Sequence, residues 1–83
     1  MPTLVLYGRP GCHLCDEARE TLTRMRSEGP GFDLDEVDIE SDDALLAAYL
    51  ERIPVVEVGG RVVSELELDA QAVRACLLPP NGP

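Results

Sequence analysis

Two cysteines spaced C-x-x-C follow a short apolar run near the start of the chain, and this junction restricts the fold more than any other feature. The run Leu4–Tyr7 ends at Gly8, and its unbroken hydrophobicity predicts a strand buried on both faces. After a turn at 9–11, apolar residues recur at helical spacing until the break Gly29-Pro30-Gly31, which predicts an amphipathic helix. The expected inner face of that helix is Leu14, Ala18, Leu22 and Met25. The cysteines therefore lie between a buried strand and the first turn of a helix.

The next part of the chain predicts a second strand and a shorter helix. Phe32–Ile39 has alternating apolar residues that change phase, so this strand either starts late or contains a bulge. Its acidic residues suit an edge strand that must not pair with another chain. Ser41 is the expected N-cap of the helix, because its hydroxyl can accept from an unpaired helix amide. The expected apolar side of this helix is Leu45, Leu46, Tyr49 and Leu50.

The last third of the chain predicts a hairpin and a final helix. Two β-branched runs flank Gly59-Gly60, which is typical of a two-residue turn, and this spacing places Val56 opposite Val63. Asp69 is the expected cap of the final helix, and the proline-rich residues 79–83 cannot continue it and should fray. The expected inward face of that helix is Val73, Cys76 and Leu77. We expect Cys76 to pack in the core and not to take part in redox chemistry, because an unpaired cysteine is among the most buried residue types.

These elements follow one another in the order β-α-β-α-β-β-α. The first β-α-β unit predicts two parallel strands, and the hairpin adds two antiparallel ones. We expect an α/β fold with a four-stranded mixed sheet flanked by three helices. A chain of 83 residues is enough for one small core, and the sequence shows no repeat or linker, so a single domain is expected over residues 1–83.

The charge balance narrows the class of partner. Sixteen acidic residues against seven arginines give a formal net charge of −9, so a phosphate backbone would be repelled and nucleic-acid binding is not expected. Either the acidity only maintains solubility, or acidic patches steer basic protein partners. The longest apolar run, Ala44–Leu50, is far too short to cross a membrane, and the first residues show no basic segment of a secretory signal. We therefore expect a cytoplasmic protein with no membrane partner.

The position of the C-x-x-C indicates redox chemistry. Cys12 would lie at or beside the helix N-cap, where unpaired amides favour a thiolate, so we expect a lowered pKa for its thiol. Cys15 lies one turn further along, close enough to form a disulfide, and more buried. The alternative is part of a zinc site, but a structural site takes four ligands and only His13 and Cys76 remain. No metal site is therefore expected.

The segment Tyr7–Cys15 resembles the active-site segment of glutaredoxins, and Ile53–Val56 resembles the cis-proline loop of the thioredoxin-like fold. The resemblance extends from Thr3 to about Leu78. It is strongest for the small bacterial glutaredoxin-like proteins, in which an acidic residue often follows the second cysteine, as Asp16 does here. The resemblance implies a thioredoxin-like fold.

The resemblance also implies roles for the residues of these two segments. Cys12 would be the nucleophile and Cys15 the resolving thiol. A cis peptide bond before Pro54 would present the backbone of Ile53 to an extended substrate.

Four further residues are candidate contacts for glutathione or another substrate. Arg9 stands where glutaredoxins place a basic residue for a glutathione carboxylate, with an ordinary surface charge as the alternative. Arg52, beside the proline loop, is a candidate second partner for a carboxylate. His13 would favour the cysteine thiolate if protonated, with a solvent-facing bystander as the alternative. Ser64 stands near the place where glutaredoxins bind the γ-glutamyl end of glutathione through Gly-Gly and an acidic pair. Here Gly59-Gly60 comes too early to serve, and the common Pro-Tyr between the cysteines is absent.

The function implied is a thiol–disulfide oxidoreductase that reduces protein disulfides or glutathione mixed disulfides. Cys12 would attack the substrate disulfide, and Cys15 would resolve the mixed disulfide. We expect no bound cofactor, a monomer, and glutathione, another thiol or a reductase as the source of electrons. Two other classes stay open: a thioredoxin-fold module that binds a partner without turnover, and a metal or iron–sulfur carrier that uses Cys12 across a dimer.

Overall fold

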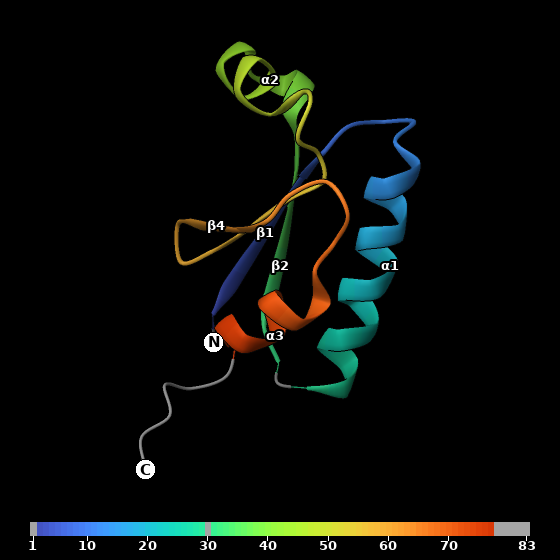
Figure 1. Ribbon diagram of the computed structural model, residues 1–83, viewed down its shortest axis with the longest axis vertical. Coiled ribbons are helices and arrows are strands. Elements are labelled where there is room, and N and C mark those ends of the chain that lie inside the picture. The colour runs from blue at the N-terminus through green and yellow to red at the C-terminus, as the bar shows by residue number, and fades with distance from the viewer. Residues whose placement is uncertain (1, 30, 78–83) are drawn as a thin grey trace.

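The computed structural model describes residues 2–29 and 31–77, so the expected frayed tail at 79–83 lies outside the described residues. The strands are β1 (Thr3–Gly8), β2 (Asp33–Asp38), β3 (Val55–Val58) and β4 (Arg61–Ser64). The helices are α1 (His13–Glu28), the 3-10 turn η1 (Ile39–Ser41), α2 (Asp43–Tyr49) and α3 (Ala70–Leu77) (Figure 1). In the described residues, no helix has the length and hydrophobicity that a membrane span requires.

The four strands form one mixed sheet in the order β2-β1-β3-β4. Strand β1 pairs in parallel with β2 and antiparallel with β3, and β3 pairs antiparallel with β4. This confirms the predicted α/β fold with a four-stranded mixed sheet and three α-helices, the architecture of the thioredoxin-like fold. The residues that follow the interior strand β1, including both cysteines, therefore lie at the end of the sheet where β1 finishes.

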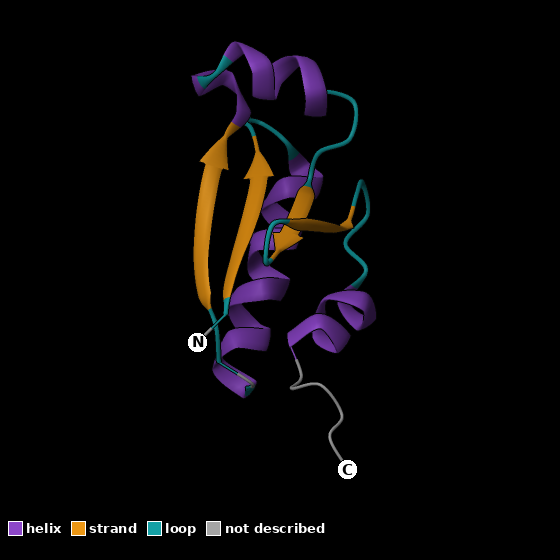
Figure 2. Ribbon diagram, turned by 90° about the vertical axis from the view of Figure 1, so that its left-hand side faces the viewer, coloured by secondary structure: helices purple, strands orange, loops and turns teal. Residues whose placement is uncertain are grey.

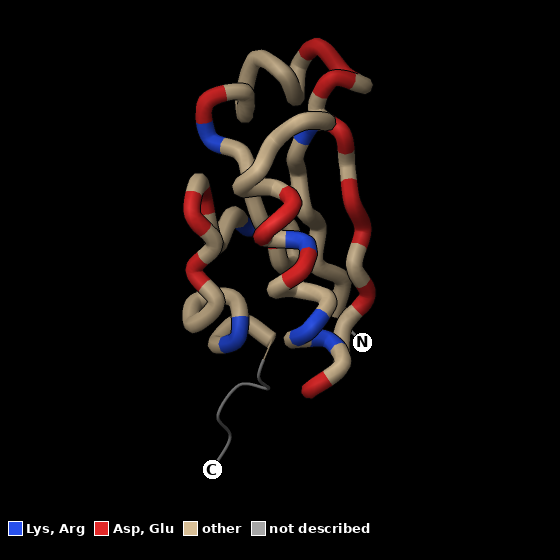
Figure 3. Tube along the Cα trace, turned by 90° about the vertical axis from the view of Figure 1, so that its right-hand side faces the viewer, with Lys and Arg blue, Asp and Glu red and all other residues tan. Residues whose placement is uncertain are grey.

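Strand β2 lies at the edge, as its acidic residues predict, and Figure 3 shows acidic positions repeated along it. Its register with β1 is continuous from Thr3↔Asp33 to Gly8↔Asp38. The strand starts at Asp33 and no bulge interrupts it, so Leu34 and Val37 point to opposite faces of the sheet.

One face of the sheet carries the hydrophobic core. Helices α1 and α3 pack on this face, while Figure 2 shows α2 across the end of the sheet to which β1 and β2 point. No residue of α2 is buried, so the apolar side expected for this helix is only partly covered. The core consists of Leu4, Leu6, Ala18, Leu22, Met25, Phe32, Val56, Val73 and Leu77.

Two apolar positions predicted to face the core are exposed. The side chain of Leu14 is 43% exposed, and Cys15 takes its place on the inner face of α1 with 1% exposure. Ala18, Leu22 and Met25 are buried as predicted, and Cys15, three residues before Ala18, completes this face in place of Leu14. Cys76 is also exposed, because the core ends at Val73 and Leu77 on the neighbouring positions of α3.

The hairpin and the second helix differ from prediction by one residue each. The turn at Gly59-Gly60 forms with positive φ at both glycines, but a bulge then pairs Val56 with Ser64, so the expected pairing with Val63 is wrong. The N-cap of α2 is Asp42, whose carboxylate accepts from the amide of Ala44. The hydroxyl of Ser41 instead donates to the backbone carbonyl of Asp38, the residue before η1. The predicted cap of α3 is confirmed, because the carboxylate of Asp69 accepts from a first-turn amide.

A polar cluster fastens α2 to the sheet on the face away from the core. The carboxylate of Glu57 in β3 accepts from the hydroxyl of Tyr7 at 3.1 Å and from that of Tyr49 at 3.2 Å. The two tyrosine rings lie 5.0 Å apart, a distance typical of a favourable aromatic pair. Partial burial, followed by the hydrogen bond to Glu57, raises the pKa of both tyrosine hydroxyls above their ordinary value of 10.0.

We expect Leu22→Ala to lower the free energy of unfolding by about 2–5 kcal/mol, because it leaves a cavity in the core. The matched change Leu14→Ala should cost less than about 0.5 kcal/mol, since that side chain is exposed on the same helix. Urea unfolding of both variants checks this. Equal losses would show that α1 buries the face predicted from the sequence.

The tyrosine cluster predicts a loss of stability at alkaline pH. Both tyrosines have a raised pKa in the folded protein, so the unfolded chain loses these protons first and the free energy of unfolding should fall as pH rises above about 10. The chain has no lysine and only two tyrosines, so few other groups titrate in this range. Urea unfolding from pH 8 to pH 11 should show a shallower decline for the variant Tyr7→Phe/Tyr49→Phe. If the free energy of unfolding of this variant falls as steeply as that of the unchanged protein, groups other than the two tyrosines cause the decline.

Candidate active site

Cys12 and Cys15 lie at the start of α1 and are joined as a disulfide, with their Cα atoms 5.2 Å apart. Cys12 is the N-cap residue, and its Sγ accepts a hydrogen bond from the amide of Cys15 at 3.1 Å. Such an amide, unpaired within the helix, also favours a thiolate over a thiol when the pair is reduced. Cys12 is half-buried, whereas Cys15 is almost fully buried. One sulfur is therefore accessible and the other is held behind it.

Gly8 at the end of β1 makes room for the buried cysteine. A Cβ atom at this position would lie 3.0 Å from the Sγ of Cys15 and 3.1 Å from its Cβ. These distances are tighter than ordinary van der Waals contacts, so a side chain at this position would force Cys15 to shift by a few tenths of an ångström. The β1 backbone thus sets how closely the helix carrying the cysteines can approach the sheet.

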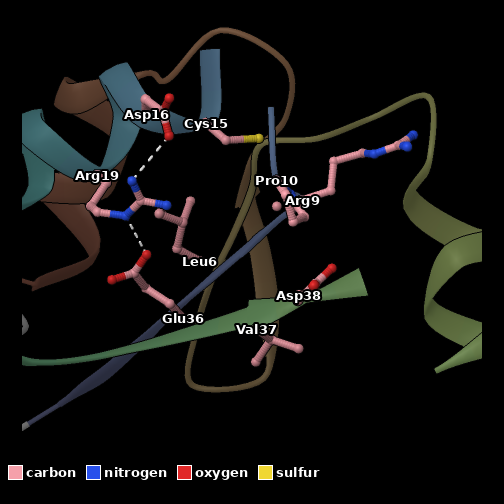
Figure 4. A pocket seen from close by; sticks show the side chains of 10 residues that line it. Leu6, Arg9, Pro10, Cys15, Asp16, Arg19, Glu36, Val37 and Asp38 are labelled. Carbon is pink, nitrogen blue, oxygen red and sulfur yellow. Dashed lines mark hydrogen bonds and ion pairs between the residues drawn. The ribbon is translucent and has the colours of Figure 1, made fainter. Parts of the chain in front are cut away.

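A cavity of about 260 Å³ lies beside Cys15, between α1 and the ends of β1 and β2 (Figure 4). Arg19 lines this cavity and forms ion pairs with Asp16 at 3.0 Å and with Glu36 of β2. These bonds raise the pKa of the Arg19 guanidinium further above its ordinary value, so it stays charged. The ion pairs connect the first turns of α1 to the edge strand.

The proline loop lies at the same end of β1. The peptide bond between Ile53 and Pro54 is cis, as the resemblance implies. Val55 pairs with Tyr7, so the antiparallel register brings Pro54 opposite Gly8, the residue that contacts Cys15. The cysteine pair and the proline loop are thus adjacent through β1.

The proline loop is also fastened to the loop before α3. The carbonyl of Arg52 accepts from the amide of Leu66 at 2.8 Å. The side chain of Arg52 lies 3.8 Å from a carboxylate oxygen of Glu65. Leu66 has a positive φ of 63°, an uncommon conformation for a leucine.

The other residues predicted to contact a substrate are Arg9, His13 and Ser64, and they differ in exposure and in their partners. Arg9 pairs with Glu40 of η1 at 2.8 Å, and both side chains are partly exposed. His13 is exposed in the first turn of α1. Ser64 is buried, and its hydroxyl accepts from the amide of Asp69 and donates to the carbonyl of Glu67. These internal bonds give no support to a role of the Ser64 hydroxyl in binding glutathione.

Across the described ranges, no group of three or more His, Cys, Asp or Glu side chains is arranged to hold a metal ion. Cys76 lies on α3, which Figure 1 shows toward the other end of the molecule from the first turn of α1. The fold therefore brings together the sulfur atoms of Cys12 and Cys15, the two candidates for redox chemistry.

Two features of the site were missed by the sequence analysis. The sequence prediction uses Gly8 only as the end of a strand, although a glycine between a strand and the turn before a C-x-x-C is a signal for close backbone approach. The prediction places Leu14 in the core, whereas this side chain is exposed and lines a cavity of about 160 Å³ together with Glu17 and Glu67. A choice of helical phase that counted Cys15 as apolar would have found it.

Comparison with known proteins places the chain among others of similar length. The family model described as Glutaredoxin-like domain (DUF836) matches residues 3–78. The uncharacterized protein Rv0508 of Mycobacterium tuberculosis is 34% identical over 79 residues, which cover 89% of this chain and 80% of that protein. The solution structure of protein Ne2328 from Nitrosomonas europaea is similar with a TM-score of 0.82 and 30% identity, covering 93% of this chain and 92% of the other. The X-ray structure of protein XcR50 from X. campestris has a TM-score of 0.66 and 41% identity, with 87% and 91% covered.

The contact at Gly8 predicts a cost that depends on the sulfur of Cys15. We expect Gly8→Ala to lower the free energy of unfolding of the oxidised protein by about 1–3 kcal/mol, because the new methyl group overpacks against Sγ and Cβ. In a Cys12→Ser/Cys15→Ala background the same change should cost less, since Sγ is gone. A double-mutant cycle by urea unfolding measures the difference. Equal costs in both backgrounds would show that the contact with the sulfur is not the cause.

Proposed function

The chain belongs to the glutaredoxin-like domain family, and we propose that it is a thiol–disulfide oxidoreductase that acts through Cys12 and Cys15. The observation that carries this proposal is the asymmetry of the pair. The accessible sulfur of Cys12 caps α1 and accepts an amide hydrogen bond, while Cys15 is buried behind it at bonding distance. A nucleophilic and a resolving thiol need this difference.

In the proposed reaction the Cys12 thiolate attacks one sulfur of a substrate disulfide. A mixed disulfide forms, and the other substrate sulfur leaves as a thiolate. Cys15, deprotonated as it reacts, then attacks Cys12 and releases the second substrate thiolate. Two electrons pass from the dithiol to the substrate, and the protein is left with the disulfide of the present structure. A low-molecular-weight thiol such as glutathione, or a flavoprotein reductase, would restore the dithiol.

The charge and composition support the remaining parts of the proposal. A monomer acting in the cytoplasm fits a small acidic chain in which no helix of the described residues is suited to cross a membrane. Arg9, Arg52, His13 and the backbone of Ile53 remain the proposed substrate contacts. The alternatives are a binding module without turnover and a metal or iron–sulfur carrier, and a spectrum of anaerobically purified protein tests the latter.

Single cysteine substitutions test the roles of the two thiols. We expect Cys12→Ser to have no measurable reductase activity on a model disulfide, because the nucleophile is lost. Cys15→Ser should still perform the first step and accumulate a mixed disulfide on Cys12, detectable by mass spectrometry.

Cys76→Ser is the matched control and should keep the activity of the unchanged protein, because that cysteine is exposed on α3. Full activity of Cys12→Ser would refute the assignment of the nucleophile. Absence of both a disulfide and a mixed disulfide in the unchanged protein would favour the binding module.

A further inference from the structure

A groove lined by Leu14 of the C-x-x-C segment carries features that the proposed chemistry does not require. It lies between the first turns of α1 and the loop that leads into α3, with a volume of about 160 Å³. We call it the Leu14 groove. Its lining residues are Leu14, Glu17, Ala18, Thr21, Glu67 and Leu68. Leu14 stands between Cys12 and Cys15 in the sequence, so the groove includes a side chain of the C-x-x-C segment itself.

Leu66 adds a second exposed apolar side chain next to the groove. It directly precedes Glu67, and 52% of its surface is exposed. Its left-handed backbone costs about 1–2 kcal/mol for a residue with a Cβ, and its amide is fixed to the carbonyl of Arg52 in the proline loop. A leucine held outward in this conformation, in a loop bonded to the proline loop, is typical of binding surfaces and contributes little to the core.

The charges around the groove are negative. Among the ion pairs of the described residues, none includes Glu17 or Glu67. Arg9 and Arg52, the two arginines predicted as carboxylate contacts, each have a carboxylate beside them, Arg9 that of Glu40 at 2.8 Å and Arg52 that of Glu65 at 3.8 Å. An anionic ligand would compete with these carboxylates and approach two further ones. A cationic segment meets complementary charge without any such exchange.

We propose that the substrate of the Cys12–Cys15 pair is a disulfide in a positively charged polypeptide segment that has apolar residues beside its cysteine. The inference rests on the oxidoreductase function proposed above. The apolar residues contact Leu14 and Leu66, and the basic residues face Glu17 and Glu67. Glutathione disulfide, which is small and anionic, fits neither feature. The reaction is the exchange described above, with the peptide disulfide as the oxidant and the protein dithiol as the reductant.

The test is a single-turnover reaction that needs no external reductant. The protein is reduced, separated from the reducing agent and mixed with synthetic peptide disulfides that share a leucine beside each cysteine and differ in their flanks: arginine, serine or glutamate. A fourth peptide keeps the arginines and replaces the leucine by serine, and glutathione disulfide is the fifth substrate. At low salt we expect the arginine–leucine peptide to react about tenfold faster than the glutamate peptide, with the serine-flanked peptide between them. The fourth peptide and glutathione disulfide should both react more slowly than the arginine–leucine peptide, and added salt should reduce the effect of charge.

Charge variants assign the effect to the groove. Glu17→Gln/Glu67→Gln should reduce the ratio of the two rates, arginine–leucine peptide over glutamate peptide, by about threefold or more. Glu20→Gln/Glu28→Gln removes the same charge from exposed positions on α1 outside the groove and should leave the ratio nearly unchanged. Using a ratio cancels any general change in the reactivity of Cys12.

The outcomes separate the two proposals. If no peptide and no glutathione disulfide is reduced, the oxidoreductase function falls and this inference falls with it. If all substrates react at similar rates, or glutathione disulfide and the glutamate peptide react fastest, the protein is an oxidoreductase but the inference is wrong. If the control variant changes the ratio as much as the groove variant, net charge and not the Leu14 groove selects the substrate, and the inference is also wrong.

Discussion

The contact between Cys15 and the end of β1 is the constraint on which the site depends. A strand residue without a side chain lets the Cys15 sulfur pack directly against the backbone of Gly8. This contact buries Cys15 against β1 and leaves Cys12, one turn earlier, at the helix end where its sulfur accepts from an amide. The pairing of β1 with β3 then places Pro54 at the same end of the sheet. Burial of one sulfur and exposure of the other are thus consequences of one close approach.

The sequence predicted those parts of the fold that depend on local pattern. Apolar spacing located α1, the paired glycines located the hairpin, and the position of the cysteines between strand and helix located the site. The phase of α1 was ambiguous, because Leu14 and Cys15 are both apolar and adjacent. Cys15 precedes Ala18 by three residues and Ala18 precedes Leu22 by four, which is the helical spacing of a buried face. The sequence therefore contained the signal for Cys15, but the prediction chose Leu14 because its side chain is larger.

Other parts of the structure depend on contacts between distant residues and have no local signal. The bulge that pairs Val56 with Ser64 coincides with the use of the serine hydroxyl in the loop before α3, which only the folded loop reveals. The same holds for the arginines. Their positions matched a family pattern, yet Arg9 finds Glu40, about thirty residues away along the sequence, and is no longer an unpaired charge. A positional resemblance identifies a residue, whereas its partners decide its chemistry.

Two electrostatic effects of opposite sign meet at Cys12, and they act over different distances. The amide that bonds to its sulfur acts at 3.1 Å and favours negative charge on that atom. The formal charge of −9 acts over the surface, is screened over about 8 Å at physiological ionic strength, and repels anions that approach. The first effect governs the reactivity of the thiol, because it depends on contact. The second governs which molecules reach it, because it acts before contact. An acidic protein can therefore hold a thiolate, provided that the stabilisation of the negative sulfur is local.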